Sequence, residues 1–455
     1  MEHILLAHSA ISHISDEPVF ISGEELESFW MPFTANRAFK VAPRLLQRAK
    51  GMWYWDVDDR PILDATAGLW CVNAGHCRSE IQQAITEQSQ TLDFAPTFQM
   101  GHPLAFHFAR RLIQHTPDRL THVFFTTSGS ESVDTALKIA LAYHHARGEA
   151  ERIMFIGREK AYHGVGFGGI SVGGLPNNRA AFANRLLTDH LPHTLDLKHN
   201  SFSRGMPSYG IEKADALQEL IHKHGAERIA AVIIEPVAGS AGVIIPPAGY
   251  LQRIRDICTA HGILLIFDEV ITGFGRLGTP FASNFFGVVP DIMTTAKGLT
   301  NAAVPMGAVF ISDQIHDDII ENASQPIELF HGYTYSGHPL ACAAGIAALQ
   351  VYEQEGLLTR GTRLAVPFEE MVHSLRDQPN VIDIRNLGLM AAIELQPRPG
   401  APGVRGMEVM KHAFAQGLLL RVTGDIIALS PPLIIEEAHM SQIHDTLMNI
   451  LKVVP

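Results

Sequence analysis

ILLIFDEV, at residues 263–270, is the stretch of sequence that decides the fold. Five apolar residues are followed directly by two acids, Asp268 and Glu269. An unbroken apolar run predicts a strand that is buried on both faces, as in a mostly parallel α/β sheet. Ligands of such sheets bind beyond the carboxyl ends of the strands, so we expect Asp268 to meet a cationic group there.

Two other interpretations of this segment stay open when it is taken alone. A nucleotide hydrolase carries a similar strand whose acid holds Mg²⁺, but it also needs a loop of the form GxxxxGK[ST], which this chain lacks. In the other interpretation, the acid pair simply ends a strand in solvent.

Lys297 is the candidate cation. It lies 29 positions after Asp268, between the strand-like run DIMTTA and the Gly- and Pro-containing segment 301–307. A lysine that is removed from water in such a turn has a lowered pKa and becomes an amine nucleophile. Taken alone, Lys297 is more commonly a surface lysine; the pairing with Asp268 favours the catalytic interpretation.

A third element, FFTTSGSES at residues 124–132, predicts an anion site. It is a strand that runs into a Gly-Ser turn and opens a helix near Ser132. Backbone N–H groups at the start of a helix, with serine hydroxyls beside them, bind phosphate. The alternative for the segment in isolation is an ordinary serine cap of the helix.

Two glycine-rich segments fit the dinucleotide-binding pattern GxGxxG, at 164–169 and 273–278. Neither is followed by an amphipathic helix, because Gly173, Gly174 and Pro176 follow the first and Pro280 follows the second. A dinucleotide site of the Rossmann type needs that helix, so both segments argue against one.

From about residue 120 onward, short apolar runs alternate with longer helical patterns, which is typical of βαβ units around a largely parallel sheet flanked by helices. We expect one helix at Ser132–Arg147. The expected strands are Val123–Thr127, Arg152–Ile156, Ile229–Ile234, Ile263–Phe267 and Met306–Ile311.

The pattern changes near residue 337, which predicts a smaller α+β domain formed by both chain ends. We expect an N-terminal segment at 1–70 with strands near 53–56 and 62–65, a large domain at 71–336, and a C-terminal part at 337–455. The elements expected in the C-terminal part are helices at Leu340–Tyr352 and Phe368–Leu375 and strands near Leu389–Leu395 and Ile426–Ser430.

Composition limits the classes of partner. The 455-residue chain has a formal net charge of −12, which disfavours nucleic acid as a partner. No run approaches the roughly 20 apolar residues that cross a bilayer, and the start of the chain lacks a basic signal-peptide region. We interpret its four cysteines as small, buried, reduced residues of a cytoplasmic protein, with no metal site.

Several short motifs, in this order and spacing, resemble the class III aminotransferases of the fold-type-I pyridoxal 5'-phosphate superfamily: Ser128-Gly129-Ser130, Tyr162-His163-Gly164, Glu235-Pro236, Asp268-Glu269-Val270 and Lys297. Four further segments, at 30–37, 98–103, 331–336 and 421–425, are similar to the ω-amino acid:pyruvate (β-alanine:pyruvate) aminotransferases in particular. The resemblance covers nearly the whole chain.

The resemblance implies a cofactor site built around Lys297, which binds pyridoxal phosphate covalently and moves the substrate proton. Asp268 pairs with the ring nitrogen, Val270 and Tyr162 hold the two ring faces, and Glu235 lies behind Asp268 or near the ring hydroxyl. The further residues implied are His163 beside the ring, Ser128, Gly129 and Ser130 at the phosphate, and Thr334 of the partner subunit. A homodimer is then the smallest active unit, and pairing of dimers into tetramers stays open.

The same resemblance implies that Arg421 binds the substrate carboxylate, and that it moves aside for amines that have none. Phe33, Trp70, Tyr162 and the partner's Phe98 are implied to shape an aromatic pocket. Each also has an ordinary interpretation, as a core or interface aromatic or, for Arg421, as a salt-bridge residue. Cys71-Val72-Asn73 departs from the smaller residues expected after Trp70.

The function expected from the resemblance is transfer of an amino group from an ω-amino acid or amine to pyruvate, which yields alanine. Taurine-, GABA- and ornithine-type donors remain alternatives. The rivals from other classes are an NAD-dependent oxidoreductase that uses one of the glycine segments, and a non-catalytic scaffold.

Overall fold

The computed structural model describes residues 21–182 and 186–455. Its central sheet has seven strands in the order β4-β10-β9-β8-β7-β5-β6. Only β10 runs against its neighbours β4 and β9, and the other pairs are parallel. The strands are β4 (Leu120–Thr126), β5 (Met154–Arg158), β6 (Thr188–Leu191), β7 (Ile229–Ile234), β8 (Leu264–Asp268), β9 (Ile292–Thr295) and β10 (Gly307–Ser312).

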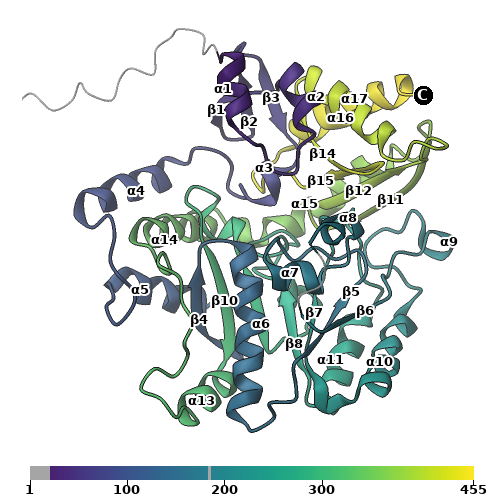
Figure 1. Ribbon diagram of the computed structural model, residues 1–455. Coiled ribbons are helices and arrows are strands. Elements are labelled where there is room, and N and C mark those ends of the chain that lie inside the picture. Colours follow the sequence, from purple (N-terminus) through teal and green to yellow (C-terminus); the bar gives the residue numbers. More distant parts are fainter. Residues whose placement is uncertain (1–20, 183–185) are drawn as a thin grey trace, which may run out of the picture.

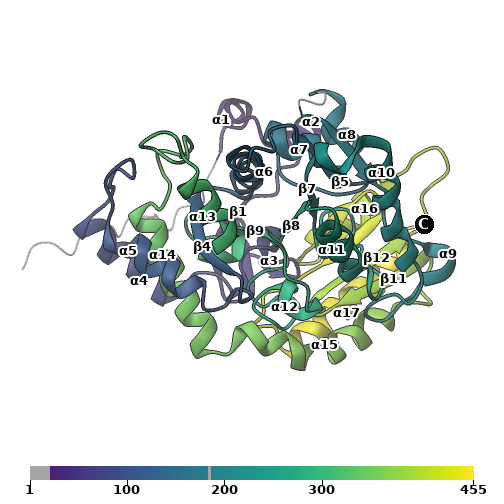
Figure 2. The ribbon, with the colours of Figure 1, turned by 90° about the horizontal axis from the view of Figure 1, so that it is seen from below.

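Helices cover both faces of this sheet (Figures 1 and 2). On β7, Ala231 and Ile233 pack with α6, whereas Val232 and Ile234 pack on the opposite face with α10 and α11. Both faces of the sheet are therefore buried, which explains the unbroken apolar run of β8. The larger helices around the sheet are α4 (Ser79–Thr91), α5 (Pro103–Leu112), α6 (Gly129–Ala146), α10 (Ala216–His224), α11 (Tyr250–Ala260), α13 (Asp313–Glu321) and α14 (Pro339–Gln354).

The expected strands of the central sheet are confirmed, with ends that differ by up to three residues. The helix expected from Ser132 begins earlier, at Gly129, because the Ser128 hydroxyl caps it by accepting a hydrogen bond from the Glu131 N–H at 3.2 Å. Gly129 and Ser130 therefore form the first turn of α6 rather than a loop before it.

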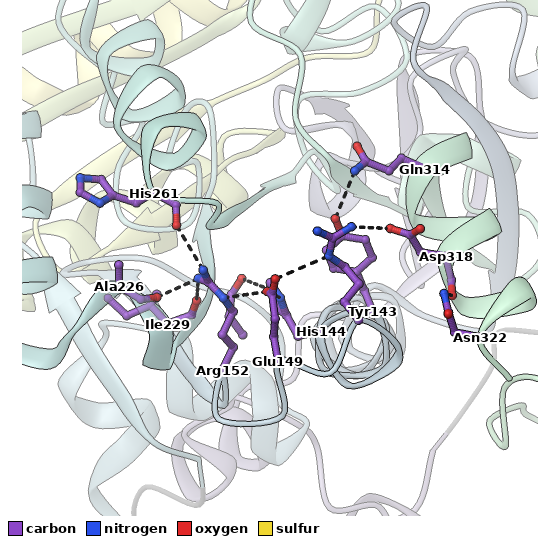
Figure 3. Close-up of polar contacts among 12 residues, drawn as sticks. Tyr143, His144, Glu149, Arg152, Ala226, Ile229, His261, Gln314, Asp318 and Asn322 are labelled. Carbon is purple, nitrogen blue, oxygen red and sulfur yellow. Dashed lines mark hydrogen bonds and ion pairs between the residues drawn. The ribbon is translucent and has the colours of Figure 1, made fainter. Parts of the chain in front are cut away.

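Polar contacts fix the far end of α6 (Figure 3). His144 Nε2 lies 2.9 Å from the Ala230 carbonyl oxygen in β7, and its Nδ1 lies 3.1 Å from a Glu149 carboxylate oxygen. Arg152 pairs with that same carboxylate and donates to the carbonyl oxygen of Ile229. Because the helix is anchored at this end, its N-terminal turn is held in place at the opposite edge of the sheet.

Both chain ends contribute to a smaller region above the sheet, where the purple N-terminal strands lie beside the yellow C-terminal helices in Figure 1. β13 (Leu418–Leu419) pairs with β3 (Pro61–Asp64) in a sheet of order β1-β2-β3-β13, with β1 at Leu46–Lys50 and β2 at Trp53–Asp56. A second sheet is antiparallel, in the order β11-β12-β15-β14. Its strands are β11 (Val381–Leu387), β12 (Met390–Leu395), β15 (Ile426–Leu429) and β14 (Arg421–Thr423).

The helices of this region are α15 (Leu357–His373), α16 (Val404–Ala415) and α17 (Glu437–Val453). The helix expected at 368–375 is thus the end of the longer α15, which continues through Pro367. α14 follows the expected boundary at 337 yet packs against α4 and α5 of the large part. The boundaries near 70 and 337 stay a prediction.

Short helices connect these parts: α1 (Gly23–Ser28), α2 (Asn36–Val41), α3 (Ala67–Trp70), α7 (Phe167–Val172), α8 (Pro176–Ala180), α9 (Leu197–Asn200), α12 (Ala282–Phe286) and the 3-10 turns η1 (Ile211–Asp215), η2 (Ala226–Arg228) and η3 (Lys297–Thr300). No helix in the described ranges is long and apolar enough to cross a membrane. All four cysteines are free, but the expectation that all are buried is wrong, because Cys77 is exposed and Cys71 is partly exposed.

Candidate active site

A cavity of about 140 Å³ lies beyond the carboxyl ends of β7 and β8. Most of the predicted cofactor residues line it, together with three that were not predicted, Gly164, Ile271 and Ala296. The lining residues predicted from the sequence are Gly129, Ser130, Tyr162, His163, Glu235, Asp268, Val270 and Lys297. The structure thus brings together residues that are up to 168 positions apart in the chain.

Lys297 follows β9 and begins the turn η3 with a positive φ of 51°. Removal from water lowers the pKa of Lys297 from 10.5 to about 8. Its amine forms no hydrogen bond or ion pair with any residue in the described part of the chain. At neutral pH a usable fraction of this amine is therefore unprotonated and free to react.

Asp268 ends β8 and is nearly buried, with 5% of its surface exposed. One carboxylate oxygen accepts a hydrogen bond from the backbone N–H of Val270 at 3.1 Å. The other lies 2.8 Å from Nδ1 of His163, which donates to it. His163 Nε2 is buried and has no partner among the described residues. The carboxylate is thus fixed in orientation at the edge of the cavity.

Glu235, the first residue after β7, is a second buried acid in the site. Desolvation, with a smaller contribution from the charge of Asp268, raises the pKa of Glu235 from 4.5 to about 7. One of its carboxylate oxygens accepts the backbone N–H of Tyr162 at 3.0 Å. Near neutral pH this acid is half protonated, so it can act as a hydrogen-bond donor as well as an acceptor.

The start of α6 forms one wall of the cavity. A Cβ atom on Gly129 would lie 3.0 Å from a Val270 methyl group, so any side chain here would press on Val270 at the cavity wall. Ser130 Oγ accepts the backbone N–H of Val165 at 3.0 Å. Ser128 does not line the cavity, because its hydroxyl caps the helix as the ordinary interpretation of this segment held. Its contact with a phosphate stays a prediction.

The glycine-rich segment 164–169 packs on α6. A Cβ atom on Gly164 would lie 2.5 Å from Ser130 Oγ, and one on Gly166 would lie 2.3 Å from an Asp134 carboxylate oxygen. Asp134 also accepts the backbone N–H of Gly169 at 2.9 Å. These glycines allow the loop that begins at Tyr162 and His163 to lie directly on the helix. Sequence reasoning missed Asp134, because its only signal is its position one turn beyond Ser130.

The other glycine segment, 273–278, packs against the start of α15, and Gly278 lies against Thr362. Within it, Arg276 is fully buried and donates to Asn73 Oδ1 at 2.8 Å. Asn73 in turn donates to the Phe274 carbonyl oxygen at 2.9 Å. Asn73 belongs to the segment 71–73, which departs from the expected pattern. These two hydrogen bonds give it a structural role, in which it supports the turn that begins at Lys297.

The residues predicted for the substrate pocket do not all lie at the cavity, in contrast to most of the predicted cofactor residues. Phe33 meets Tyr162 edge to face, with ring centroids 6.5 Å apart. Arg421, on β14, forms no ion pair within the described residues, and its Nε is buried without a partner. Trp70 is 2% exposed and packs in the apolar cluster behind Ile271 instead of lining the cavity. Its substrate contact stays a prediction.

Phe98 and Thr334 do not line the cavity of their own chain and are both exposed. They lie near each other, since a Cβ atom on Gly332 would lie 2.9 Å from the Phe98 ring. Phe98 and Thr334, which are predicted to reach the active site of the partner subunit, thus lie in one exposed area of this chain.

Comparison with known proteins identifies the family. Residues 34–451 match the model of the class-III aminotransferases. The omega-aminotransferase of Caulobacter vibrioides is 59% identical over 94% of this chain and 98% of its own length. The beta-alanine–pyruvate aminotransferase of Pseudomonas aeruginosa is 48% identical over 91% and 93%.

A solved structure agrees with these sequence relatives. The amine transaminase from an uncultivated Pseudomonas species, in a pyridoxal-phosphate-bound form, superposes with a TM-score of 0.86 at 35% identity and covers 94% of this chain and 99% of its own. The chain belongs to the class III aminotransferases, enzymes that transfer amino groups by means of pyridoxal phosphate.

Proposed function

We propose that this aminotransferase moves an amino group from an ω-amino acid such as β-alanine, or from an amine, to pyruvate. The products are alanine and an oxo acid, aldehyde or ketone. The names of the two relatives above support this assignment. The observation that carries it is Arg421, which has no ion-pair partner among the described residues and whose charge acts on Tyr162 and Lys297 at the cavity, because it combines a carboxylate-binding group with an aromatic wall.

The cavity fits pyridoxal phosphate by the chemistry of its walls. An amine and a carboxylate, from Lys297 and Asp268, line the same small space. A buried nitrogen of His163 has no partner among the described residues, and Gly129 leaves room where a side chain would close the wall. When bound, this cofactor supplies an electrophilic carbon for the donor nitrogen and a ring that accepts electrons from the substrate carbon.

Lys297 is proposed to hold the cofactor and then to take the proton from the substrate carbon that bears the nitrogen. A group with a pKa of about 8 suits this work, because it gains and loses a proton readily near neutral pH. Its amine has no hydrogen-bond or ion-pair partner in residues 21–182 and 186–455, which leaves it available for both tasks.

Asp268 is proposed to hold the ring nitrogen in its protonated form through a charge-assisted hydrogen bond. His163 keeps the carboxylate in the required orientation. Glu235, whose pKa is raised to about 7, is proposed to lie behind Asp268 or near the ring hydroxyl and is about half protonated at neutral pH. Val270 and Tyr162 are proposed to hold the ring between them, and Gly129 and Ser130 to bind the phosphate at the start of α6.

Arg421 is proposed to bind substrate carboxylates with two parallel hydrogen bonds, and to leave room for the side chain of an amine donor. Phe33, Trp70 and Tyr162 are proposed to shape the space for that side chain. The partner's Phe98 and the partner's Thr334 complete the site, so the enzyme is proposed to be at least a homodimer. The four free thiols suit a cytoplasmic location.

A donor screen with pyruvate as acceptor, scored by the alanine formed, tests this function. β-Alanine and 1-phenylethylamine are expected to give alanine, and Lys297→Ala is expected to give none. Arg421→Ala is expected to lose the half-reaction of the holoenzyme with β-alanine while it keeps the half-reaction with the amine, and its alanine formation should fall with every donor because pyruvate also carries a carboxylate. Faster alanine formation from taurine, GABA or ornithine would assign the enzyme to one of those donor types instead, and an enzyme that forms no alanine from any donor would contradict the proposal.

A further inference from the structure

We propose that Thr423 is a positioning residue, which holds β14 against the loop at 238–244 and so sets where the Arg421 guanidinium meets a substrate carboxylate. The inference rests on the proposed role of Arg421. It starts from one contact, in which Thr423 Oγ1 donates a hydrogen bond to the Ser240 carbonyl oxygen at 3.0 Å.

β14 is held by strand pairing on one side only, and α16 packs against it. It is a strand of three residues at the edge of its sheet, and it pairs with β15 alone. An edge strand leaves one row of backbone groups without strand partners. The Thr423 side chain adds a fixed point to this short strand beyond its pairing with β15 and its packing against α16.

Arg421 and Thr423 occupy alternate positions of β14, so their side chains leave the same face of the strand. Thr423 contacts the loop at Ser240. The Arg421 charge acts on Tyr162 and Lys297, both at the cavity. The backbone near the arginine is thus held, while its guanidinium has no ion-pair partner within the described chain and stays available for an anion.

The loop that receives this hydrogen bond is itself firmly held. Arg385, on the opposite edge strand β11, donates to the Gly242 carbonyl oxygen at 2.7 and 2.9 Å. A bridge between Ala238 and Ile244 closes the loop. A Cβ atom on Gly239 would lie 2.9 Å from the side chain of Ile271, which lines the cavity. The hydrogen bond from Thr423 to Ser240 therefore connects β14, which carries Arg421, to the wall of the cavity.

The position of Arg421 matters only for substrates that have a carboxylate. Amine donors without a carboxylate do not depend on it. Loss of the Thr423 hydrogen bond should therefore weaken the binding of carboxylates selectively. A residue that only stabilises the fold would affect both kinds of substrate alike.

The test uses the holoenzyme and its half-reaction with 1-phenylethylamine, followed by the change in cofactor absorbance. Propionate, which has a carboxylate but no amine or oxo group, is the competing probe. Thr423→Val removes the donor and keeps the shape of the side chain, whereas Thr423→Ser keeps the donor. Thr362→Val is the matched control, because Thr362 Oγ1 makes the same kind of bond to the Gly278 carbonyl oxygen at 3.0 Å in α15.

Thr423→Val is expected to raise the inhibition constant of propionate about fivefold, the usual effect of one hydrogen bond. Thr423→Ser and Thr362→Val should leave this constant unchanged within about twofold, and the KM for the amine should stay constant in all three. Thr423→Ala also lacks the donor and should repeat the effect of Thr423→Val, so a poorly folding valine variant does not leave the question open.

Unchanged inhibition in the valine and alanine variants would overturn the proposal, as would an equal rise in the inhibition constant and the amine KM. Arg421→Ala serves as the reference and should weaken propionate more than either variant. If it does not, the role of Arg421 and the present inference both fall. Failure of the proposed function would give a different result. In that case the enzyme would form no alanine from pyruvate, while the inhibition by propionate would still depend on Thr423.

Discussion

His163 donates a hydrogen bond from Nδ1 to the Asp268 carboxylate at 2.8 Å, and both side chains are almost fully buried at the end of β8. The histidine holds one carboxylate oxygen, and the Val270 N–H holds the other. The protein's own groups therefore fix the direction of the acid, which is the preorganisation that a charge-stabilising group needs.

Asp268→Asn is expected to lower kcat by about 10²-fold, because a neutral amide cannot keep the cofactor ring nitrogen protonated and a charge-assisted hydrogen bond of about 1.5–3 kcal/mol is lost. Steady-state kinetics and the visible spectrum of the purified variant measure this. Asp313→Asn, at the exposed start of α13, is the control. A variant at 268 with wild-type kcat would remove Asp268 from the mechanism.

Lys297→Met should stabilise the cofactor-free protein at pH 7. The folded pKa of about 8 lies below the ordinary 10.5, so below pH 8 the protein holds a desolvated charge at a cost of roughly 3 kcal/mol. This penalty disappears as pH rises from 8 to 10.5, where the folded state releases the proton first. Thermal unfolding at pH 7 and pH 10 should show a gain in Tm that shrinks at the higher pH, and a constant gain would argue against a buried ammonium.

Glu235→Gln should show the opposite dependence on pH. Its folded pKa of about 7 lies above the ordinary 4.5, so ionisation of the buried acid removes stability as pH rises from 4.5 to 7. The glutamine variant of the cofactor-free protein should therefore melt higher than wild type at pH 8 and equally at pH 4.5 or below. Equal melting temperatures at pH 8 would show that Glu235 is not desolvated in this way.

Gly166→Ala should weaken cofactor retention. The added methyl group would lie 2.3 Å from the Asp134 carboxylate, so either the loop that begins at Tyr162 and His163 must move away from α6 or Asp134 must shift and weaken its hydrogen bond from the Gly169 N–H. Overpacking of this kind costs about 1–3 kcal/mol. Dialysis followed by absorbance of the retained cofactor measures the loss. Gly23→Ala is the control, because no other part of the described chain comes within 4 Å of its Cβ position, and full retention in the Gly166 variant would show that the loop contact is dispensable.

Much of the fold and of the cofactor site was predictable, because the sequence patterns that indicate them lie within short segments of the chain. The apolar run of β8 ends at Asp268, and the lysine and the Gly-Ser turn each follow a strand of the same sheet. Parallel strands bring their carboxyl ends to one edge, so the convergence of these residues follows from the topology. The start of α6 was misplaced because a serine cap and a phosphate-binding turn have the same local sequence.

Contacts between distant segments were not predictable in this way. The position of Trp70 depends on an apolar cluster that it shares with Ile271 and Met390, far along the chain, and its contact with substrate stays a prediction. The hydrogen bond from Thr423 to Ser240 joins residues 183 positions apart and has no sequence signal, because any backbone carbonyl can accept it. Phe98 and Thr334 are assigned to a partner's site, which the pattern of one chain does not locate.

Borohydride reduction of the purified holoenzyme, followed by peptide mass spectrometry, tests the central claim most directly. Reduction converts the bond between cofactor and lysine into a stable one, so the modified peptide identifies the lysine. We predict that the pyridoxyl group is found on Lys297 and that Lys297→Ala carries none and has no turnover. A modification on another lysine, or an active and coloured Lys297→Ala protein, would contradict the account.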